Sequence, residues 1–190
     1  MSAAATLPRL LTALAMTTLL GACSSNSEPR YPERYEQTLD TVVAAPIPDQ
    51  AAQRFVAFFT SIDRPDVAAR VEALYGSPVY FSDTLFVTED RGALTRHFER
   101  LSSRGAHIEV DLDDAVVSGT DLYLRWRMRV TFPNGGPESR TIGMTQLRFD
   151  ESGRIRFHQD FWDSSEGVYR QIPVLGWFIG LVEKRIAQEH

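Results

Sequence analysis

One stretch of strict alternation constrains the fold more than any other feature of the sequence. From Leu122 to Phe132 every second residue is apolar, and the residues between them are tyrosine, threonine and the arginines at positions 125, 127 and 129. A two-residue period places the two sets of side chains on opposite faces of a strand. The pattern therefore predicts a long antiparallel strand with one face in a core and the other in water.

Further strands are expected around this one. Residues 107–112 also alternate, and residues 140–149 and 154–162 each follow a cluster of turn-forming residues. A β-rich run covers residues 79–86. Together these runs predict a sheet built mainly from long antiparallel strands.

Apolar residues at helical spacing predict three helices before the long strands. They are Phe55, Phe58, Phe59 and Ile62 in the first helix, Val67, Val71 and Leu74 in the second, and Leu94, Phe98 and Leu101 in the third. We expect Asp49 to cap the first helix, and Gly76 and Gly105 to end the other two. Helices followed by antiparallel strands predict an α+β domain with its helices on one face of the sheet.

The N-terminus predicts export rather than structure. Leu10 to Leu20 is an uncharged run of 11 residues after Arg9, which suits a signal-peptide core and is shorter than the roughly 20 residues that span a bilayer. It leads into Leu20-Gly21-Ala22-Cys23, which resembles the lipobox of bacterial lipoproteins. The resemblance implies cleavage before Cys23 and lipidation of that cysteine. The alternative is an ordinary signal peptide followed by an unrelated cysteine.

Ser24 and Ser25 follow the cysteine, without an adjacent aspartate. By resemblance to enterobacterial sorting signals, this implies a location in the cell envelope, lipid-anchored in the outer membrane and facing the periplasm. The expected domain organisation is a signal peptide at 1–22, a proline-rich tether at 23–49, the folded domain at 50–166 and an apolar C-terminal helix at 167–190. A short strand or helix at Leu39–Ala45 is an alternative within the tether.

The C-terminal segment has two interpretations. Ile172 to Val182 is almost wholly apolar and charge returns at Glu183, but the run is too short to cross a bilayer. The first interpretation is a helix that packs on the domain or covers its opening. The second is an interfacial helix that enters the membrane to which Cys23 is attached.

Composition excludes several kinds of site. One cysteine excludes a disulfide framework and any zinc site built from cysteines. The histidines at 97, 107, 158 and 190 lack metal-ligand spacing, so we expect neither a metal nor a cofactor. A net charge of −5 argues against a nucleic-acid partner.

Four segments in a fixed order carry a family resemblance: residues 53–57, residues 75–83 (YGSPVYFSD), residues 147–149 and Phe161-Trp162. Together they resemble the nuclear transport factor 2-like superfamily, which includes ketosteroid isomerases and SnoaL-like polyketide cyclases. The resemblance covers roughly residues 50–165. It implies a cone-shaped curved antiparallel sheet with three N-terminal helices packed in it, to which this chain adds a C-terminal helix.

Carried over to single residues, the resemblance is partial. It places Asp83 at the general base of the isomerases. Phe55, however, takes the place of their oxyanion-stabilising tyrosine, and Thr145 that of their protonated aspartic acid. A phenylalanine donates no hydrogen bond to a developing enolate, which argues against ketosteroid isomerisation by that mechanism.

The last strand offers a second polar group. His158, Asp160 and Trp162 share one face at a two-residue period, and this face matches pocket-lining positions of the isomerases. His158 beside Asp160 suits an acid–base pair, so the catalytic candidates are Asp83, His158 and Asp160. The expected ligand pocket is lined by Phe55, Phe59, Tyr80, Trp126, Met128, Thr145 and Trp162.

The leading functional hypothesis is a membrane-anchored lipoprotein whose domain binds a small hydrophobic molecule in an apolar pocket. The first alternative is an acid–base enzyme (an isomerase, cyclase or dehydratase) that uses Asp83 or Asp160. The second is a non-catalytic envelope interaction module that uses the sheet face or the C-terminal helix. The arginines at 125, 127 and 129 form either a solvated surface paired with acids or a homodimer interface.

Overall fold

The computed structural model describes residues 31–133 and 138–188. The chain divides into two compact units, Met1–Gln37 and Thr38–His190, and helix α1 (Tyr31–Thr41) crosses this division. Everything that forms the candidate site belongs to the second unit. The signal peptide and Cys23 lie outside the described residues and stay predictions.

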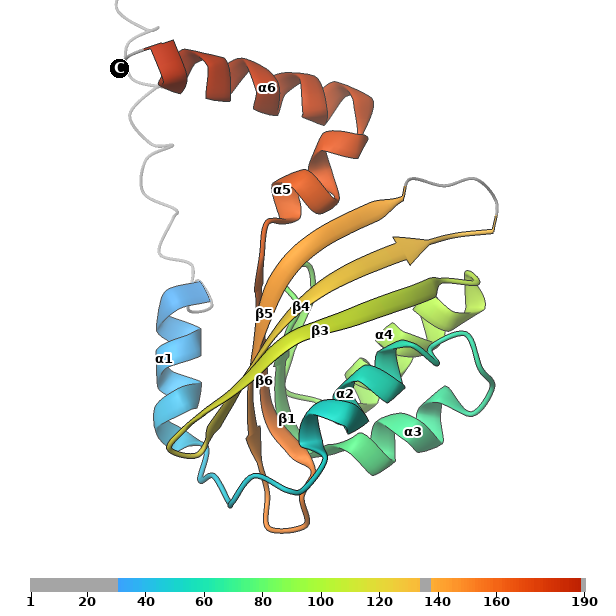
Figure 1. Ribbon diagram of the computed structural model, residues 1–190, viewed down its shortest axis with the longest axis vertical. Helices are drawn as coiled ribbons and strands as arrows, with labels where there is room; N and C mark the ends of the chain where they lie inside the picture. The colour runs from blue at the N-terminus through green and yellow to red at the C-terminus, as the bar shows by residue number, and fades with distance from the viewer. Residues whose placement is uncertain (1–30, 134–137, 189–190) are drawn as a thin grey trace, which may run out of the picture. The chain divides into compact units, whose positions relative to one another are not determined.

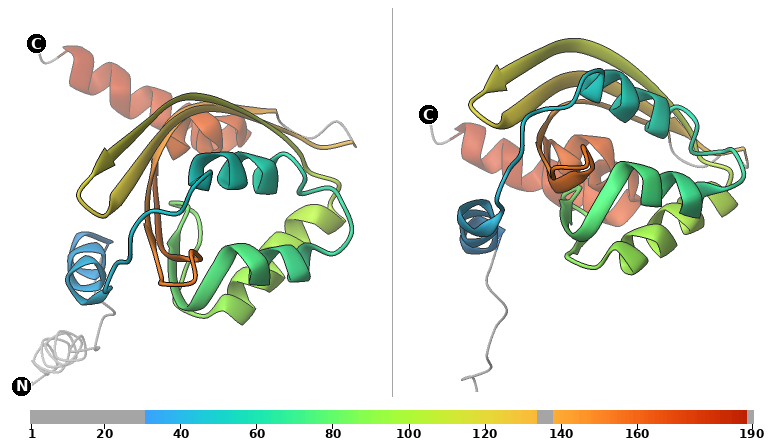
Figure 2. Two further views of the ribbon diagram at one scale, coloured as in Figure 1. Left: turned by 60° about the horizontal axis from the view of Figure 1, so that its bottom comes forward. Right: turned by 90° about the horizontal axis from the view of Figure 1, so that it is seen from below.

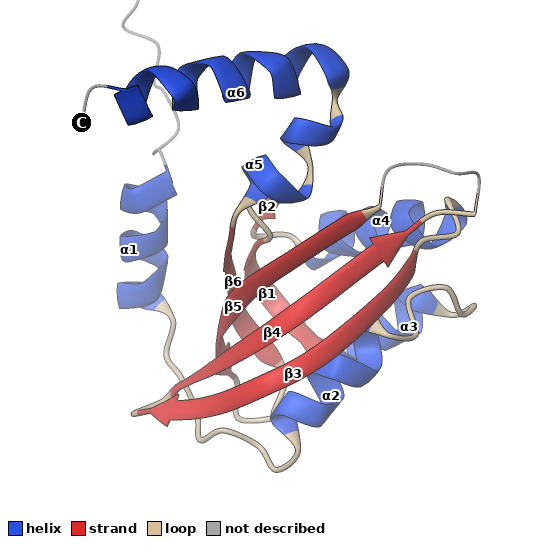
Figure 3. Ribbon diagram, turned by 45° about the horizontal axis from the view of Figure 1, so that its top comes forward, coloured by secondary structure: helices blue, strands red, loops and turns tan. Residues whose placement is uncertain are grey.

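Six strands form one curved sheet in the order β2-β1-β6-β5-β4-β3 (Figure 3). They are β1 (Tyr75–Ser82), β2 (Val87–Thr88), β3 (His107–Ser118), β4 (Asp121–Thr131), β5 (Ser139–Phe149) and β6 (Ile155–Trp162). Every neighbouring pair is antiparallel except β1 and β6, which run parallel. The alternating stretch is β4, with Leu124 and Trp126 buried and Arg125 and Arg127 exposed, so the prediction of a half-buried strand is confirmed.

Three helices cover the inner face of this sheet (Figures 1 and 2). They are α2 (Ala51–Phe59), α3 (Val67–Leu74) and α4 (Arg91–Ser103). The buried core cluster lies between Ala51 and Ile155, with many aromatic residues where the helices meet the strands. This unit therefore holds its own core, and the predicted α+β class is confirmed.

The helix boundaries differ in detail from those predicted. Gln50, with a φ of 58°, precedes α2 in place of the expected cap at Asp49. Gly76 does not end α3 but lies in β1, where a Cβ would fall 2.5 Å from Cδ of Arg156. The close approach of the arginine side chain explains this glycine better than a helix stop does. Gly105, with a φ of 70°, follows α4 as predicted.

Part of the predicted tether joins the sheet. Residues 31–41 are helical, and the main chain at Ala45 forms a bridge to Phe149 through a 2.8 Å hydrogen bond. Arg148 also donates to the carbonyl oxygen of Leu39 over 2.6 Å. From Leu39 onward the segment is thus fixed to the domain, because these two hydrogen bonds attach it to β5.

The C-terminal segment forms α5 (Ser164–Gly167), a 3₁₀ turn η1 (Tyr169–Gln171) and α6 (Pro173–Gln188). Seven large apolar side chains of α6 are 39–70% exposed: Val174, Leu175, Trp177, Phe178, Leu181, Val182 and Ile186. The expectation that this helix packs on the domain or covers its opening is therefore wrong. No helix within 31–133 or 138–188 is long and apolar enough to cross a membrane.

Candidate functional site

Strand register brings two predicted site residues together on the inner face of the sheet. Asp160 on β6 lies opposite Thr145 on β5. His158 lies two residues earlier on β6 and therefore points to the same face. On its other side His158 is the partner of Phe81 in the parallel strand β1.

Five side chains on this face form a continuous series of hydrogen bonds, which we call the buried polar chain. Tyr75 Oη lies 3.1 Å from Nδ1 of His158, and Nε2 of His158 lies 2.9 Å from Oδ1 of Asp160. Thr145 donates to the same Oδ1 over 2.6 Å. Trp126 Nε1 donates to Thr145 Oγ1 over 2.8 Å. The buried polar chain thus runs from Tyr75, the first residue of β1, to Trp126 in the middle of β4.

The bond between His158 and Asp160 has a fixed direction. A carboxylate only accepts, so Nε2 of His158 carries a proton and donates to Oδ1 of Asp160. Burial, with smaller contributions from the charges of Asp160 and Asp83, raises the pKa of the Tyr75 phenol well above its ordinary value, so the phenol keeps its proton in the bond to Nδ1 of His158. The two neighbours thus hold the imidazole ring in one orientation.

Aromatic rings enclose the histidine end of the chain. The His158 ring centroid lies 5.8 Å from Phe55, 6.2 Å from Phe59 and 4.6 Å from Phe81. His158 itself has no exposed surface. Phe55, Phe59 and Trp126, predicted as pocket walls, are therefore packed core residues around the buried polar chain.

Asp160 is the member of the chain that reaches the surface. Its Oδ1 accepts two hydrogen bonds, whereas its Oδ2 has no partner among residues 31–133 and 138–188, and the residue is 7% exposed. Trp162 follows it on the same face toward the end of β6 and is half-buried. Met128, one inner position beyond Trp126 on β4, is half-buried as well. A carboxyl oxygen without a partner among the described residues, beside apolar side chains, is the group best placed to meet a ligand.

Gly143 allows the indole of Trp126 to take part in this chain. The two residues are partners across β4 and β5, and a Cβ on Gly143 would fall 2.5 Å from Cζ2 of the indole. Because Gly143 has no side chain, the indole ring of Trp126 can lie across β5. Its Nε1 then reaches Thr145, which is two residues after Gly143 on β5.

Asp83 lies apart from the buried polar chain, and its carboxyl group has partners of its own. Its Oδ1 accepts hydrogen bonds from the main-chain N–H groups of Leu85 and Phe86, at 2.9 and 2.6 Å. Its Oδ2 lies 3.2 Å from Nε2 of His97, whose ring stacks on Phe86 with centroids 4.4 Å apart. Oδ1 is thus engaged by a turn and Oδ2 by His97 of α4. The structure does not bring Asp83 into the buried polar chain.

Tyr80 lies on the opposite face of the sheet from His158. It is the partner of Phe157, stacks on that ring at 4.9 Å and donates to Gln159 Oε1 over 3.0 Å. Its inclusion among the pocket residues is therefore wrong. Strand alternation gives the inner position to Phe81 and the outer one to Tyr80.

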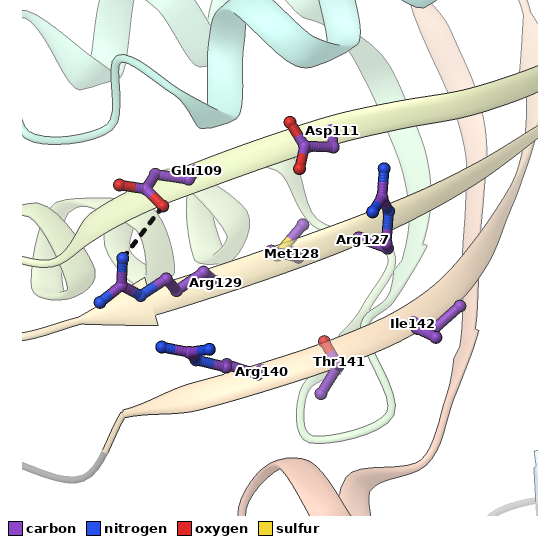
Figure 4. Close-up of a pocket in the computed structure, with 8 residues that line it drawn as sticks. All are labelled: Glu109, Asp111, Arg127, Met128, Arg129, Arg140, Thr141 and Ile142. Carbon is purple, nitrogen blue, oxygen red and sulfur yellow. Dashed lines mark hydrogen bonds and ion pairs between the residues drawn. The ribbon is translucent and has the colours of Figure 1, made fainter.

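The outer face of β3, β4 and β5 carries a surface hollow of about 470 Å³ (Figure 4). Its lining residues are Glu109, Asp111, Arg127, Met128, Arg129, Arg140, Thr141 and Ile142. Arg129 lies 2.8 Å from Glu138, and Arg127 lies 2.9 Å from Asp113. Hydrogen bonds from Arg129 and Arg140 lower the pKa of Glu138 to about 2. Arg127 and Arg129 are thus paired with acids, and the use of this face in a homodimer stays a prediction.

Two residues of these networks were not among the predicted site residues. Tyr75 enters the chain only because β1 pairs with β6 in parallel, a long-range register that local periodicity does not reveal. His97 reaches Asp83 from α4, and no spacing in the sequence links the two positions. Among the described residues, no group of three or more His, Cys, Asp or Glu side chains is arranged to hold a metal.

Comparison with solved structures shows proteins of the same fold. An LEH-like epoxide hydrolase of M. tuberculosis matches with a TM-score of 0.53 at 15% identity, over 71% of this chain and 94% of that one. The Δ5-3-ketosteroid isomerase from Mycobacterium sp. gives 0.51 at 17% identity, over 61% and 92%. A computationally designed 17-OHP binder gives 0.52 at 15%, over 62% and 93%. At these identities the likeness shows the fold alone, which is nuclear transport factor 2-like.

The family is shown by the sequence itself. No curated protein matches the chain. The family model described as the SnoaL-like domain matches residues 52–158, from the first turn of α2 to the histidine of the buried polar chain. This match covers more than half of the 190 residues, and the chain therefore belongs to the SnoaL-like domain family.

Proposed function

We propose that this domain binds a small, mostly apolar molecule whose single hydrogen-bond donor meets Oδ2 of Asp160. The observation that carries the proposal is the asymmetry of that carboxylate. Oδ1 is fixed by His158 and Thr145, whereas Oδ2 is left without a partner among the described residues. A carboxylate held in this way discriminates in favour of ligands with a hydroxyl or an N–H group.

Apolar surface for such a ligand is present next to the core. The partly buried apolar side chains that pack against the core are Ile47, Val56, Phe86, Leu101, Val110, Leu112, Met128, Val130, Phe132 and Trp162. A bound apolar molecule would complete the burial of side chains of this kind. The designed 17-OHP binder and the ketosteroid isomerase support the proposal as examples of the same fold.

Titration with N-phenyl-1-naphthylamine, a neutral apolar fluorophore with one N–H donor, tests this proposal. We expect Asp160→Asn to weaken binding by about three- to tenfold, since an uncharged acceptor forms a weaker bond. Asp111→Asn removes an exposed carboxylate on β3 and is the matched control, with no expected change. Equal affinities for the wild type and Asp160→Asn would reject the site. Native mass spectrometry of the purified protein then identifies any retained natural ligand.

Acid–base catalysis by Asp160 is the second candidate. It is favoured by the hydrogen bonds that hold the His158 imidazole beside the carboxylate. In this role Asp160 takes a proton from a carbon or hydroxyl of the ligand and returns it to another atom, as in isomerisation, cyclisation or dehydration. Turnover of an identified ligand should be lost in Asp160→Asn and kept in Asp83→Asn. Turnover that survives in the double variant would exclude this candidate.

We further propose that the protein is held in the bacterial envelope by a lipid on Cys23. The support is the order of a charged residue, a short apolar run and the Leu20-Gly21-Ala22-Cys23 sequence. Mass spectrometry of the membrane fraction should show a mature N-terminal peptide that begins with an acylated Cys23. Recovery of an unmodified cysteine, or of Cys23→Ala protein that is processed normally, would contradict this part of the proposal.

A further inference from the structure

We infer that α6 lies on a phospholipid bilayer, with its apolar half in the acyl region near the headgroups. This inference goes beyond the proposed function. Only the question of which cellular membrane α6 contacts depends on the proposed lipid anchor at Cys23. The starting observation is the exposure of seven large apolar side chains on one helix, between 39 and 70% each. Exposed apolar patches of this kind mark sites of interaction with proteins or membranes.

The helix is oriented so that these side chains point away from the rest of its unit. At 100° per residue, the seven residues occupy about half of the circumference of α6. Gly176 and Glu183 lie on the other half. Gly176 packs directly against the carbonyl oxygen of Arg170 in η1, and Glu183 forms an ion pair with the Arg170 guanidinium. The half with Gly176 and Glu183 therefore contacts η1, while the half with the seven large apolar side chains faces outward.

Arg170 also contacts α5, at the start of the C-terminal segment. Arg170 Nε lies 2.7 Å from Glu166 of α5, so one guanidinium connects α5, η1 and α6. Gly167 of α5 in turn packs on Trp162, because a Cβ there would fall 2.5 Å from the Trp162 ring. The orientation of α6 is thus linked through packed residues to the end of β6, where Asp160 and Trp162 lie.

A bilayer fits this surface better than a protein groove or a second copy of the chain. A helix in a groove presents a narrow stripe at i, i+3, i+4 and i+7, whereas here half of the circumference is apolar. Glycines allow helices to pair closely, yet Gly176 lies on the half that contacts η1. Residues 172–182 carry no charge, and Lys184 follows close to the end of the run, where a long cationic side chain reaches lipid phosphates.

The apolar run of α6 is too short to span a bilayer, so the helix would lie along the membrane surface. The uncharged run of 11 residues rises about 16 Å, roughly half of the hydrocarbon thickness. Trp177 and Phe178 lie within this run, and aromatic side chains are enriched at the level of the headgroups. The contact would bring the open oxygen of Asp160 close to apolar molecules dissolved in the same membrane.

Vesicle flotation tests the inference without any lipid anchor. The chain from Ser24 onward lacks Cys23 but contains the entire core cluster, which lies between Ala51 and Ile155. It is mixed with vesicles of phosphatidylethanolamine and phosphatidylglycerol and centrifuged through a density gradient. We expect it to float with the vesicles, and the emission of the exposed Trp177 to shift to shorter wavelength.

The variant Trp177→Gln/Phe178→Gln/Leu181→Gln should reduce the bound fraction at least about tenfold, since each large apolar side chain contributes strongly to transfer from water. The control Val116→Thr/Val117→Thr/Ile142→Thr removes three exposed apolar side chains from strands instead, and should float like the wild type. Circular dichroism checks that both variants are folded.

Three results would overturn the inference: a wild-type chain that does not float, a helix variant that floats equally, or no shift in Trp177 emission. A wild-type dimer that the helix variant converts to a monomer, without vesicle binding, would assign α6 to pairing between copies. Because neither lipidation nor N-phenyl-1-naphthylamine enters this experiment, its outcome is separate from that of the proposed function.

Discussion

Trp126 and Gly143 are partners across β4 and β5, and the indole occupies the space where any side chain at 143 would lie. This relationship positions the indole N–H on Thr145, which in turn donates to Asp160. A glycine outside the polar chain thus decides whether the carboxylate is held in place.

Gly143→Ala should therefore destabilise the protein by about 1–3 kcal/mol, because the added methyl group overpacks the sheet and displaces the indole. Chemical denaturation followed by circular dichroism measures the change. Gly180→Ala is the matched control, since a Cβ at that helical position meets nothing within 4 Å. The control should be unchanged or slightly more stable. Equal effects of the two substitutions would contradict the packing described here.

Thr145→Val should cost about 1–3 kcal/mol of unfolding free energy. The substitution keeps the shape but leaves the buried Trp126 N–H without an acceptor and removes one donor from Asp160. Thr145→Ser keeps the hydroxyl and should therefore be much closer in stability to the wild type than Thr145→Val is. If valine and serine behave alike, the hydroxyl does not hold the carboxylate.

A proton on Nε2 of His158 is a direct prediction of the buried polar chain. ¹⁵N NMR of the imidazole should show a proton bound to Nε2, because the Asp160 carboxylate can only accept from that nitrogen. This proton should exchange slowly with solvent, since the ring has no exposed surface. An Nε2 without a proton would contradict the hydrogen bond to Asp160.

Acid should weaken the fold partly through Asp121. Burial alone would raise the pKa of this carboxyl, but hydrogen bonds from Arg148 and Gln146 and the charge of Arg148 outweigh it, so the pKa lies below its ordinary value. A lowered pKa in the folded state stabilises the protein above the ordinary carboxyl pKa of about 3.9, and this contribution is lost as the pH falls through the lower, folded value.

Unfolding free energy measured from pH 7 down to pH 2 checks this contribution. Asp121→Asn should be less stable than the wild type at neutral pH, and the difference between them should shrink as the pH falls below 4. A difference that stays constant with pH would show that Asp121 contributes through packing rather than through its charge. Asp111→Asn, at an exposed site on β3, serves as the control.

Local periodicity predicted the elements of this fold well. The alternation at 122–132 identified β4, and helical spacing identified α2, α3 and α4, because an element buried on one face has apolar residues at a regular period. This pattern did not identify α1, which has no buried residue. It also led to a wrong expectation for α6, since an apolar helix has the same composition whether it is buried in a core or exposed.

The site was predictable only where it depends on one strand. His158 and Asp160 were found together because two residues on β6 share a face. Tyr75 was missed and Tyr80 was misplaced, because both depend on the parallel register of β1 against β6, which is set by contacts distant in the sequence. The role predicted for Asp83 depended on the resemblance alone, whereas in the structure its oxygens are engaged by its own turn and by His97.

A crystal structure with N-phenyl-1-naphthylamine bound tests the central claim most directly. The account predicts the N–H group of the ligand within hydrogen-bond distance of Asp160 Oδ2, with its rings against Trp162 and Met128 and the bonds from His158 and Thr145 to Oδ1 intact. A ligand seated instead in the outer hollow over Arg127, Arg129 and Arg140, with Asp160 untouched, would contradict it.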